Sequence, residues 1–144
     1  MRFRRKGVTL IELMIVIVIV AILASIAVPS YRQYVLRSHR VEAKTALLNL
    51  AAAQEKFYLE NNTYATNAEL ATTPPDGLGL AATTENDWYT IAIANGADAT
   101  TFSATATAAG AQTADTDCAT FTLTAQGVRS ATKNGGAVST VCWD

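Results

Sequence analysis

Few residues of this 144-residue chain have the types and spacing that chemistry requires. Cys118 and Cys142 are its two cysteines, and such a pair can form a disulfide, a redox couple or half of a metal site. Asp115 and Asp117 form a D-x-D pattern that could bind calcium, although a solvated loop is the simpler interpretation. His39, the single histidine, is predicted to be structural or interfacial. Without a CxxC spacing or a glycine-rich phosphate loop, the sequence predicts a protein that is no enzyme and has no metal or cofactor.

An apolar segment from Val8 to Val28 is the most distinctive element of the chain. Its 21 residues include only Thr9, Glu12 and Ser25 as non-apolar members. A helix of this length spans roughly 30 Å of hydrocarbon, so the segment is a candidate for crossing a membrane. Four basic residues precede this segment: Arg2, Arg4, Arg5 and Lys6. A signal peptide or plain anchor helix is the alternative, because Ala21–Ala27 (AILASIA) imitates a cleavage site.

A plain anchor needs neither Gly7 at the junction nor the carboxylate of Glu12. The residues from Gly7 to Glu12 read GVTLIE. Here the chain resembles the type IV pilin family, whose precursors carry a short basic leader that ends in Gly, followed by a helix that begins F-T-L-I-E. Pro29 matches a proline that the family has later in this helix. The resemblance covers the helix from about Gly7 to Phe57, and the ending of the chain looks like that of PilE-type minor pilins.

The resemblance implies that the chain is processed at its N-terminus. A prepilin peptidase would cleave after Gly7 on the cytoplasmic side, and the new terminus at Val8 would be N-methylated. The family usually has Phe at this position, and valine keeps it apolar. We therefore expect a leader at residues 1–7, a transmembrane or filament-core half of the helix at 8–29, and a periplasmic or extracellular globular domain at 30–144.

Glu12 is predicted to act in assembly. A lone carboxylate in hydrocarbon costs several kcal/mol and persists when it has a partner. Cleavage creates one, because the new α-amine of Val8 stays positively charged after methylation and could pair with Glu12 of a neighbouring subunit. Glu12 also lies in the first turns of the helix, where a negative charge complements the helix dipole.

After Pro29, which removes a backbone donor and should kink the helix, the sequence becomes amphipathic. The face predicted to carry the domain consists of Leu36, Ala43, Leu47, Leu50, Gln54 and Phe57, with Ala46 and Ala53 beside them. The face predicted to be solvated holds Arg37, Arg40, Glu42, Lys44, Glu55, Lys56 and Glu60. Tyr34, Val41 and Leu48, spaced by seven, are interpreted as contacts to neighbouring subunits. The helix is expected to end near residues 61–62, after roughly 78 Å.

Three alternating segments follow a loop that contains Pro74 to Gly77: Trp88–Ala94, Phe102–Ala108 and Thr120–Ala125, with a weaker fourth at Val128–Thr132. Alternation with period two predicts strands with one buried face. The expected fold is α+β, with the long helix packed against an antiparallel sheet of three to four strands. The ends of the Ala/Thr-rich stretch from Ala97 to Ala114 are interpreted as loop.

On a chain whose body is exported, Cys118 and Cys142 are most simply interpreted as a disulfide, which matches the disulfide-bounded C-terminal region of the family. It would close a loop of about 25 residues and contribute roughly 3 kcal/mol to stability.

Charge bears on nucleic acid. From Lys56 onward the chain has three basic residues (Lys56, Arg129 and Lys133) and nine acidic ones, so this part should repel phosphate. No nucleic-acid partner is therefore expected.

The sequence thus predicts a structural subunit of a type IV pilus, more in the manner of a minor than a major pilin. Its expected partners are other pilin subunits, the prepilin peptidase, the pilus assembly machinery, and the inner membrane before assembly. It would lie in the inner membrane first and in the extracellular pilus afterwards. The alternatives are a type II secretion pseudopilin, which the cysteine pair disfavours, and a DNA-uptake receptor.

Overall fold

The structure is a computed structural model that describes residues 7–95 and 99–144. Its elements in chain order are α1 (Leu10–Asn61), η1 (Asn67–Glu69), β1 (Tyr89–Asn95), β2 (Phe102–Ala108), η2 (Gly110–Ala114), β3 (Thr120–Thr124) and β4 (Arg129–Thr132). Contacts within the chain separate two compact units, one up to Val35 and one from Leu36 to Asp144. The boundary expected at 29–30 stays a prediction. Of the expected leader only Gly7 is described, and the N-terminal end of the Ala/Thr-rich stretch, Ala97, lies outside the described residues.

The first unit consists of the beginning of α1 and the three residues before it. From Gly7 to Tyr34 every residue is exposed, including the 18 apolar side chains between Val8 and Val28. Pro29 lies inside the helix, and the Ser30 hydroxyl donates to the Ile26 carbonyl over one turn. This unit therefore has no core of its own.

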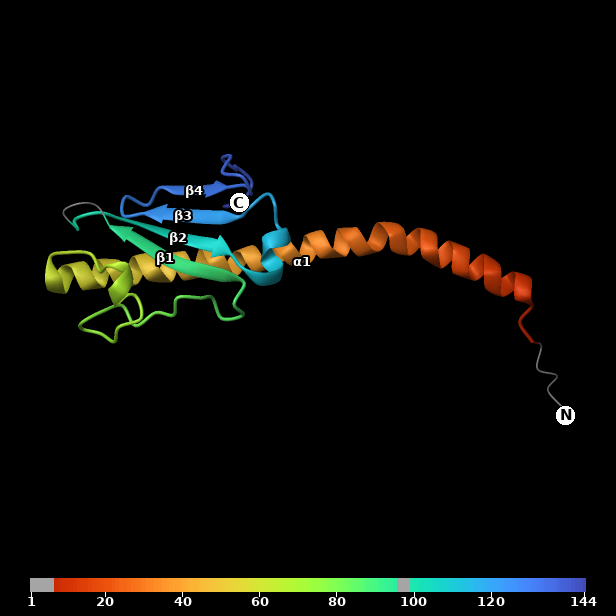
Figure 1. Cartoon of the computed structure of the whole chain (residues 1–144), viewed down its shortest axis with the longest axis horizontal. Coiled ribbons are helices and arrows are strands. Elements are labelled where there is room, and N and C mark those ends of the chain that lie inside the picture. Colours follow the sequence, from red (N-terminus) through yellow and green to blue (C-terminus); the bar gives the residue numbers. More distant parts are fainter. Residues whose placement is uncertain (1–6, 96–98) are drawn as a thin grey trace. The chain divides into compact units, whose positions relative to one another are not determined.

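The second unit contains a four-stranded antiparallel sheet in the order β1-β2-β3-β4 (Figure 1). Every predicted strand is found, with bounds that differ by one residue at most. In the register, Ile91 lies opposite Ala106, and Ala106 lies opposite Phe121. The alternation of the sequence thus places one apolar row across all strands. One outer edge is partly covered by a bridge between Thr83 and Thr90.

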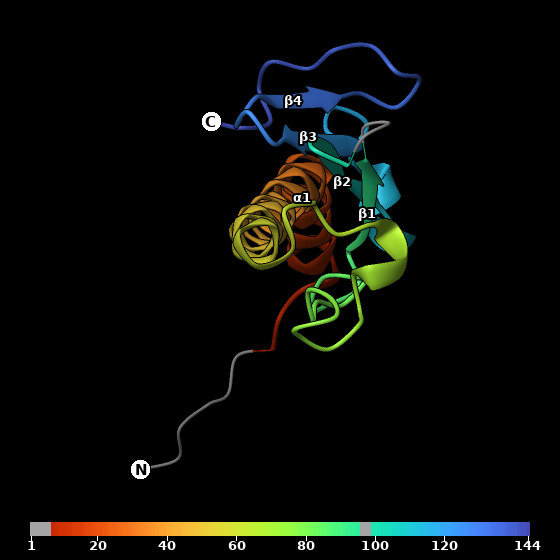
Figure 2. The ribbon, with the colours of Figure 1, turned by 90° about the vertical axis from the view of Figure 1, so that its left-hand side faces the viewer.

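The apolar row packs on the second half of α1, which lies beside the sheet (Figures 1 and 2). The helix contributes Ala43, Leu47, Leu50 and Phe57 to the core, as predicted from its periodicity. In β2 the buried residues are Phe102, Ala104 and Ala106, and the two alanines are fully inaccessible. The predicted α+β fold is confirmed.

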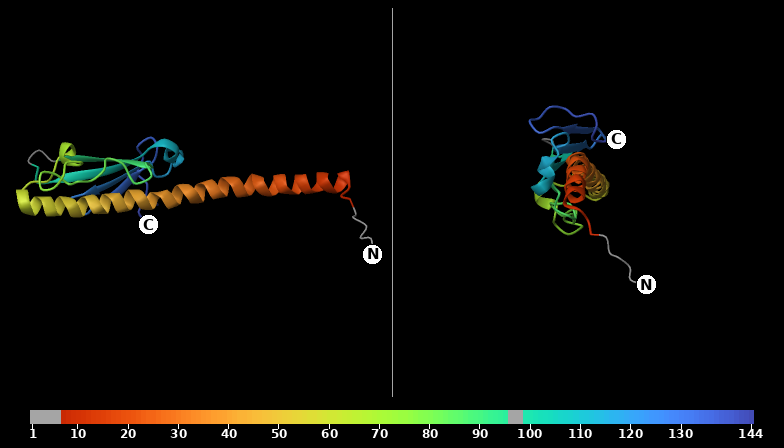
Figure 3. Two further views of the ribbon diagram at one scale, coloured as in Figure 1. Left: turned by 90° about the horizontal axis from the view of Figure 1, so that it is seen from below. Right: turned by 90° about the vertical axis from the view of Figure 1, so that its right-hand side faces the viewer.

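A long connection, residues 62–88, runs from the end of α1 to the start of β1 (Figure 3). It is fixed at its start by Gln54, which is fully buried in α1. The Gln54 side chain donates to the Ala65 carbonyl and accepts from the Ala65 amide, both at 2.8 Å. A buried amide without partners would be costly, so these two hydrogen bonds explain why a polar residue occupies a core position.

Candidate functional site

The site expected for processing lies at the start of α1. Gly7, Val8 and Thr9 precede the helix in extended, exposed chain. A peptide bond in such a segment can enter the extended cleft of a peptidase without unwinding a helix. Among the described residues α1 is also the helix long and apolar enough to cross a membrane by length and composition.

Glu12 is bonded to its own helix in a way that the sequence analysis missed. The Thr9 amide and the Thr9 hydroxyl both donate to Glu12 Oε2 at 2.9 Å, and the Glu12 amide donates back to Thr9 Oγ1 at 3.2 Å. This reciprocal arrangement is a capping box, whose T-x-x-E spacing is visible in the sequence. The carboxylate therefore stabilises the start of its own helix, and Oε1 has no such bond among the described residues.

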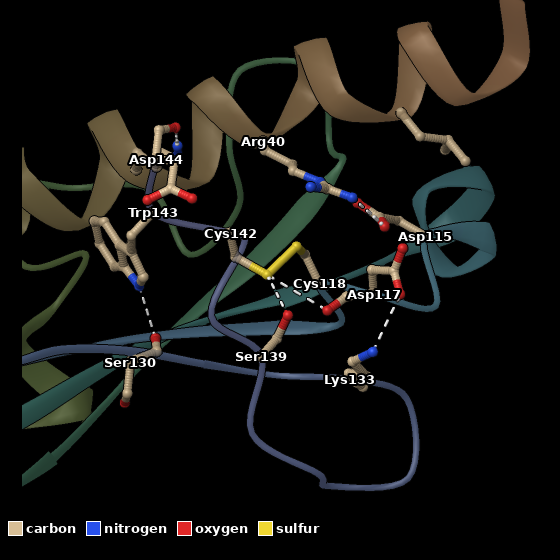
Figure 4. The surroundings of a disulfide bond; sticks show 12 residues. Arg40, Asp115, Asp117, Cys118, Ser130, Lys133, Ser139, Cys142, Trp143 and Asp144 are labelled. Carbon is tan, nitrogen blue, oxygen red and sulfur yellow. Dashed lines mark hydrogen bonds and ion pairs between the residues drawn. A yellow bond between two sulfur atoms is a disulfide. The ribbon is translucent and has the colours of Figure 1, made fainter. Parts of the chain in front are cut away.

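Arg40 of α1 and Asp115, which follows η2, form a buried ion pair. Arg40 was predicted on the solvated face of α1 and Asp115 in a solvated loop, and both predictions are wrong. Arg40 is 8% exposed and Asp115 is 3% exposed. Arg40 Nε donates to Asp115 Oδ2 at 2.7 Å, and its terminal nitrogen donates to Oδ1 at 2.8 Å (Figure 4). The hydrogen bond to Asp115 raises the pKa of Arg40, and a carboxylate held this way is no longer free to bind calcium.

Gln112, which also donates to Asp115 Oδ2 at 3.3 Å, connects this ion pair to α1 and β1. Its side-chain nitrogen donates to the Leu36 carbonyl at 3.0 Å and to the Tyr89 hydroxyl at 2.9 Å. Its oxygen lies 2.9 Å from His39 Nδ1, so that nitrogen carries the proton. Burial raises the pKa of Tyr89 to about 12. The network is fully internal and holds η2 against α1, which is a structural role.

His39 belongs to this structural network. Its ring stacks on Trp88 with centroids 4.3 Å apart and an angle of 11° between the planes. Within residues 7–95 and 99–144 no group of three or more His, Cys, Asp or Glu side chains could hold a metal ion together.

The cysteines form the C-terminal disulfide, Cys118 to Cys142, with both residues buried (Figure 4). The Ser139 hydroxyl donates to Cys142 Sγ at 3.1 Å. Beside the bridge, Asp117 is half-exposed and lies 3.5 Å from Lys133 Nζ. The disulfide thus fixes the chain end to the start of β3.

The two basic residues between the cysteines already have neighbours on the chain. The Arg129 guanidinium lies 5.5 Å from the centroid of the Trp143 ring, and Lys133 is near Asp117. The Trp143 indole donates to the Ser130 carbonyl at 2.7 Å, which holds its ring in place. Neither cation is buried, so both can contact a ligand.

Two family profiles match adjacent stretches of the chain. The profile described as "Prokaryotic N-terminal methylation motif" matches residues 2–28. The profile described as "Type IV minor pilin ComP, DNA uptake sequence receptor" matches residues 29–135. The chain belongs to this family of type IV minor pilins. The assignment agrees with the long exposed helix, the four-stranded sheet and the C-terminal disulfide.

Similar proteins support the assignment of this pilin. It is 49% identical over 61 residues to the type IV major pilin protein PilA of Myxococcus xanthus, which is 42% of this chain and 28% of that protein. It is 44% identical over 78 residues to the type IV major pilin protein PilE1 of Neisseria gonorrhoeae, which is 50% of this chain and 46% of that protein. The matched part of this pilin thus spans less than half of either relative.

A solved type IV pilin from Shewanella oneidensis has the same fold. The TM-score is 0.52 at 26% identity, and the alignment covers 76% of this chain and 98% of that one. The family description names a DNA uptake sequence receptor, which conflicts with the expectation that this pilin has no nucleic-acid partner.

Proposed function

We propose that this chain is a structural subunit of a type IV pilus that assembles through its N-terminal helix. The observation that carries the proposal is the exposed apolar segment from Val8 to Val28, which coincides with a methylation motif. An apolar helix without a partner is stable in a membrane or among other such helices. Before assembly the segment would lie in the inner membrane, and afterwards in the core of a filament outside the cell.

The proposed maturation is cleavage between Gly7 and Val8, followed by methylation of Val8. The new amine would lie one residue before the Thr9–Glu12 capping box. Because both bonds from Thr9 go to Oε2, the second oxygen of Glu12 is the one offered to the amine of a neighbouring subunit. The partners implied are the prepilin peptidase, the assembly machinery and other pilins.

Mass spectrometry of the chain from cells with a prepilin peptidase tests this proposal. We expect a mature chain that starts at methylated Val8 and is present in sheared pili. Gly7→Trp should leave the uncleaved precursor in the membrane fraction. A mature terminus after Ala27, or an unprocessed chain in the pili, would show that the segment is an ordinary signal peptide or anchor.

DNA capture is the second candidate function, and the family match over residues 29–135 favours it. The charge of the unit opposes it, because Leu36–Asp144 holds six basic and eleven acidic residues, a net charge of −5. Two exposed cations on β4 and the loop after it, Arg129 and Lys133, are the contacts that a duplex could use. Each phosphate contact adds only about one unit to the salt dependence of binding, so two contacts give weak affinity.

A gel-shift titration of duplex DNA with the second unit separates the two candidates. We expect no shift at physiological salt, because the net charge repels phosphate. A shift that is lost when both Arg129 and Lys133 are changed to Ala would establish DNA capture. Lys56→Ala is the matched control, since Lys56 lies on α1 away from these residues.

A further inference from the structure

A groove of about 320 Å³ runs between α1 and the segment that precedes β1. Its floor is apolar and includes Ala46, Leu50 and Ile91. Its walls carry two carboxylates, Glu42 from the helix and Glu85 from the opposite segment. All of these residues belong to the second unit. The groove therefore combines an apolar floor with negative charge, which suits a long cationic side chain.

One of the two carboxylate oxygens of Glu42 has a hydrogen-bond partner among the described residues, and the other has none. Its Oε1 accepts a hydrogen bond from Asn86 Nδ2 at 2.5 Å. Its Oε2 is shielded from solvent and has no hydrogen-bond partner within the described residues. Neither ion pair found in that part of the chain involves Glu42. A shielded carboxylate without a cation is costly, so a positive charge held in the groove beside Glu42 would be favoured electrostatically.

The chain itself offers a suitable donor on the neighbouring face of α1. Three of the other cations of the second unit have contacts of their own, namely Arg40 with Asp115, Lys44 with the Asp144 carbonyl, and Lys133 with Asp117. Arg37 is exposed, and neither ion pair of the described residues involves it. It has no acidic residue three or four positions away that could pair with it along the helix.

Arg37 cannot reach Glu42 of its own chain. Five residues of helix separate the two side chains by about 7.5 Å along the axis and about 140° around it. Arg37 instead shares an exposed face with Val41 and Leu48, which are 61% and 44% exposed. A second copy that lies alongside, shifted along the helix, can bring this face against the groove.

We propose that the groove receives Arg37 of a second copy of this chain, whose guanidinium pairs with Glu42 while its stem covers the apolar floor. The inference rests on the proposed function, since it names the contact by which neighbouring subunits meet. The contact joins Arg37 of one copy to Glu42 of the next, and Val41 borders both surfaces. Repeated in one direction, such a contact is heterologous and continues along a filament.

Charge reversal in full-length chains tests the contact. Two copies with different tags are produced in the same cells, and their co-purification is measured from solubilised membranes and from sheared pili. Arg37→Glu or Glu42→Arg alone should lower co-purification by up to about fivefold, the upper limit for a partly exposed ion pair. The double reversal in both copies should restore it. Lys56→Glu, which changes the same charge on α1 within the second unit but does not line the groove, should have no effect.

The outcomes distinguish this inference from the proposed function. If the single reversals leave co-purification unchanged, or if the double reversal fails to restore it, the contact is wrong. Wild-type copies that are present in pili but do not co-purify also overturn it and point to a different pilin in the groove. A chain that is absent from pili, yet co-purifies from membranes in the predicted pattern, would refute the pilus function alone. Disulfide formation in each variant, followed on non-reducing gels, reports whether the second unit is folded.

Discussion

The two units of this chain differ in whether their apolar side chains are exposed or buried. From Gly7 to Tyr34 every residue is exposed, although most of them are valine, isoleucine, leucine or alanine. From Leu36 onward the apolar residues are shared between one helix face and one sheet face, and 18 hydrophobic residues form a buried core. The first unit can bury its surface only against lipid or other chains, whereas the second buries its surface against itself.

Substitutions in the second unit should therefore affect folding, and substitutions in the first unit should affect assembly. In the second unit a substitution alters contacts that the chain makes with itself, so the free energy of unfolding should report it directly. In the first unit the residues from Gly7 to Tyr34 are all exposed, so the effect should appear when membranes or other subunits are present. The predictions below test this division, from the largest expected effect on the second unit to the smallest.

Arg40→Met should cause the largest loss. It leaves Asp115 buried without its cation, and breaking a buried pair from one side costs about 3–5 kcal/mol. Denaturant unfolding of a fragment from Leu36 to Asp144 measures the change. The double variant with Asp115→Leu should recover much of the stability, because both charges are then gone. A single variant as stable as wild type would contradict the structural role of this pair.

Removing the disulfide should rank second. The bridge joins residues 24 positions apart, and closing a loop of that size contributes roughly 3 kcal/mol. Changing both Cys118 and Cys142 to Ser should lower the unfolding free energy of the same fragment by about this amount. Reduction of the wild-type fragment with dithiothreitol should give a similar loss, which separates the effect of the bond from that of the serines.

Alkaline pH should destabilise the second unit through Tyr89. Its pKa is raised to about 12 by burial, against 10.0 for an ordinary tyrosine. The folded state therefore favours the protonated phenol, so this stabilisation is complete below pH 10 and is lost as the pH rises toward about 12. Two pKa units correspond to about 3 kcal/mol at most.

Unfolding curves on both sides of this pH window measure the loss. Tyr89→Phe has no phenol to ionise and should lose less stability across it, although it gives up the bond to Gln112 at every pH. Equal slopes for both proteins would show that other groups control alkaline unfolding.

Glu12→Ala should have the smallest effect on the domain and the clearest effect on assembly. The unfolding free energy of the second unit in the full-length chain should stay within about 0.5 kcal/mol, because among the described residues Glu12 bonds only to Thr9. Incorporation into sheared pili should fall. Thr9→Val removes one donor to the same carboxylate and is the matched control for the capping box. Wild-type amounts of the Glu12→Ala chain in pili would break the proposed charge pair.

The helix and strands were predictable because their apolar residues recur with a regular period in the sequence. Strands such as β3 alternate strictly, and the core positions Leu47, Leu50 and Phe57 recur at helical spacing. The chain end was predictable from its two cysteines, since a pair on an exported domain has few other uses.

The polar interior was not predictable from periods. Arg40 is spaced three before Ala43 and seven before Leu47, which places it on the buried face, but its charge led to the opposite assignment. Only the fold shows that Asp115, 75 residues away, supplies the compensating carboxylate. Glu42 has the same ambiguity, and its groove depends on a segment whose sequence has no regular pattern.

The strand order β1-β2-β3-β4 has a consequence for how the domain is made. Each strand pairs with the one that precedes it in the chain, so the sheet grows by successive hairpins without waiting for a distant segment. A chain that emerges in sequence order delivers the strands in that same order. β2, β3 and β4 then each find the preceding strand already present, and local pairing of this kind favours fast folding.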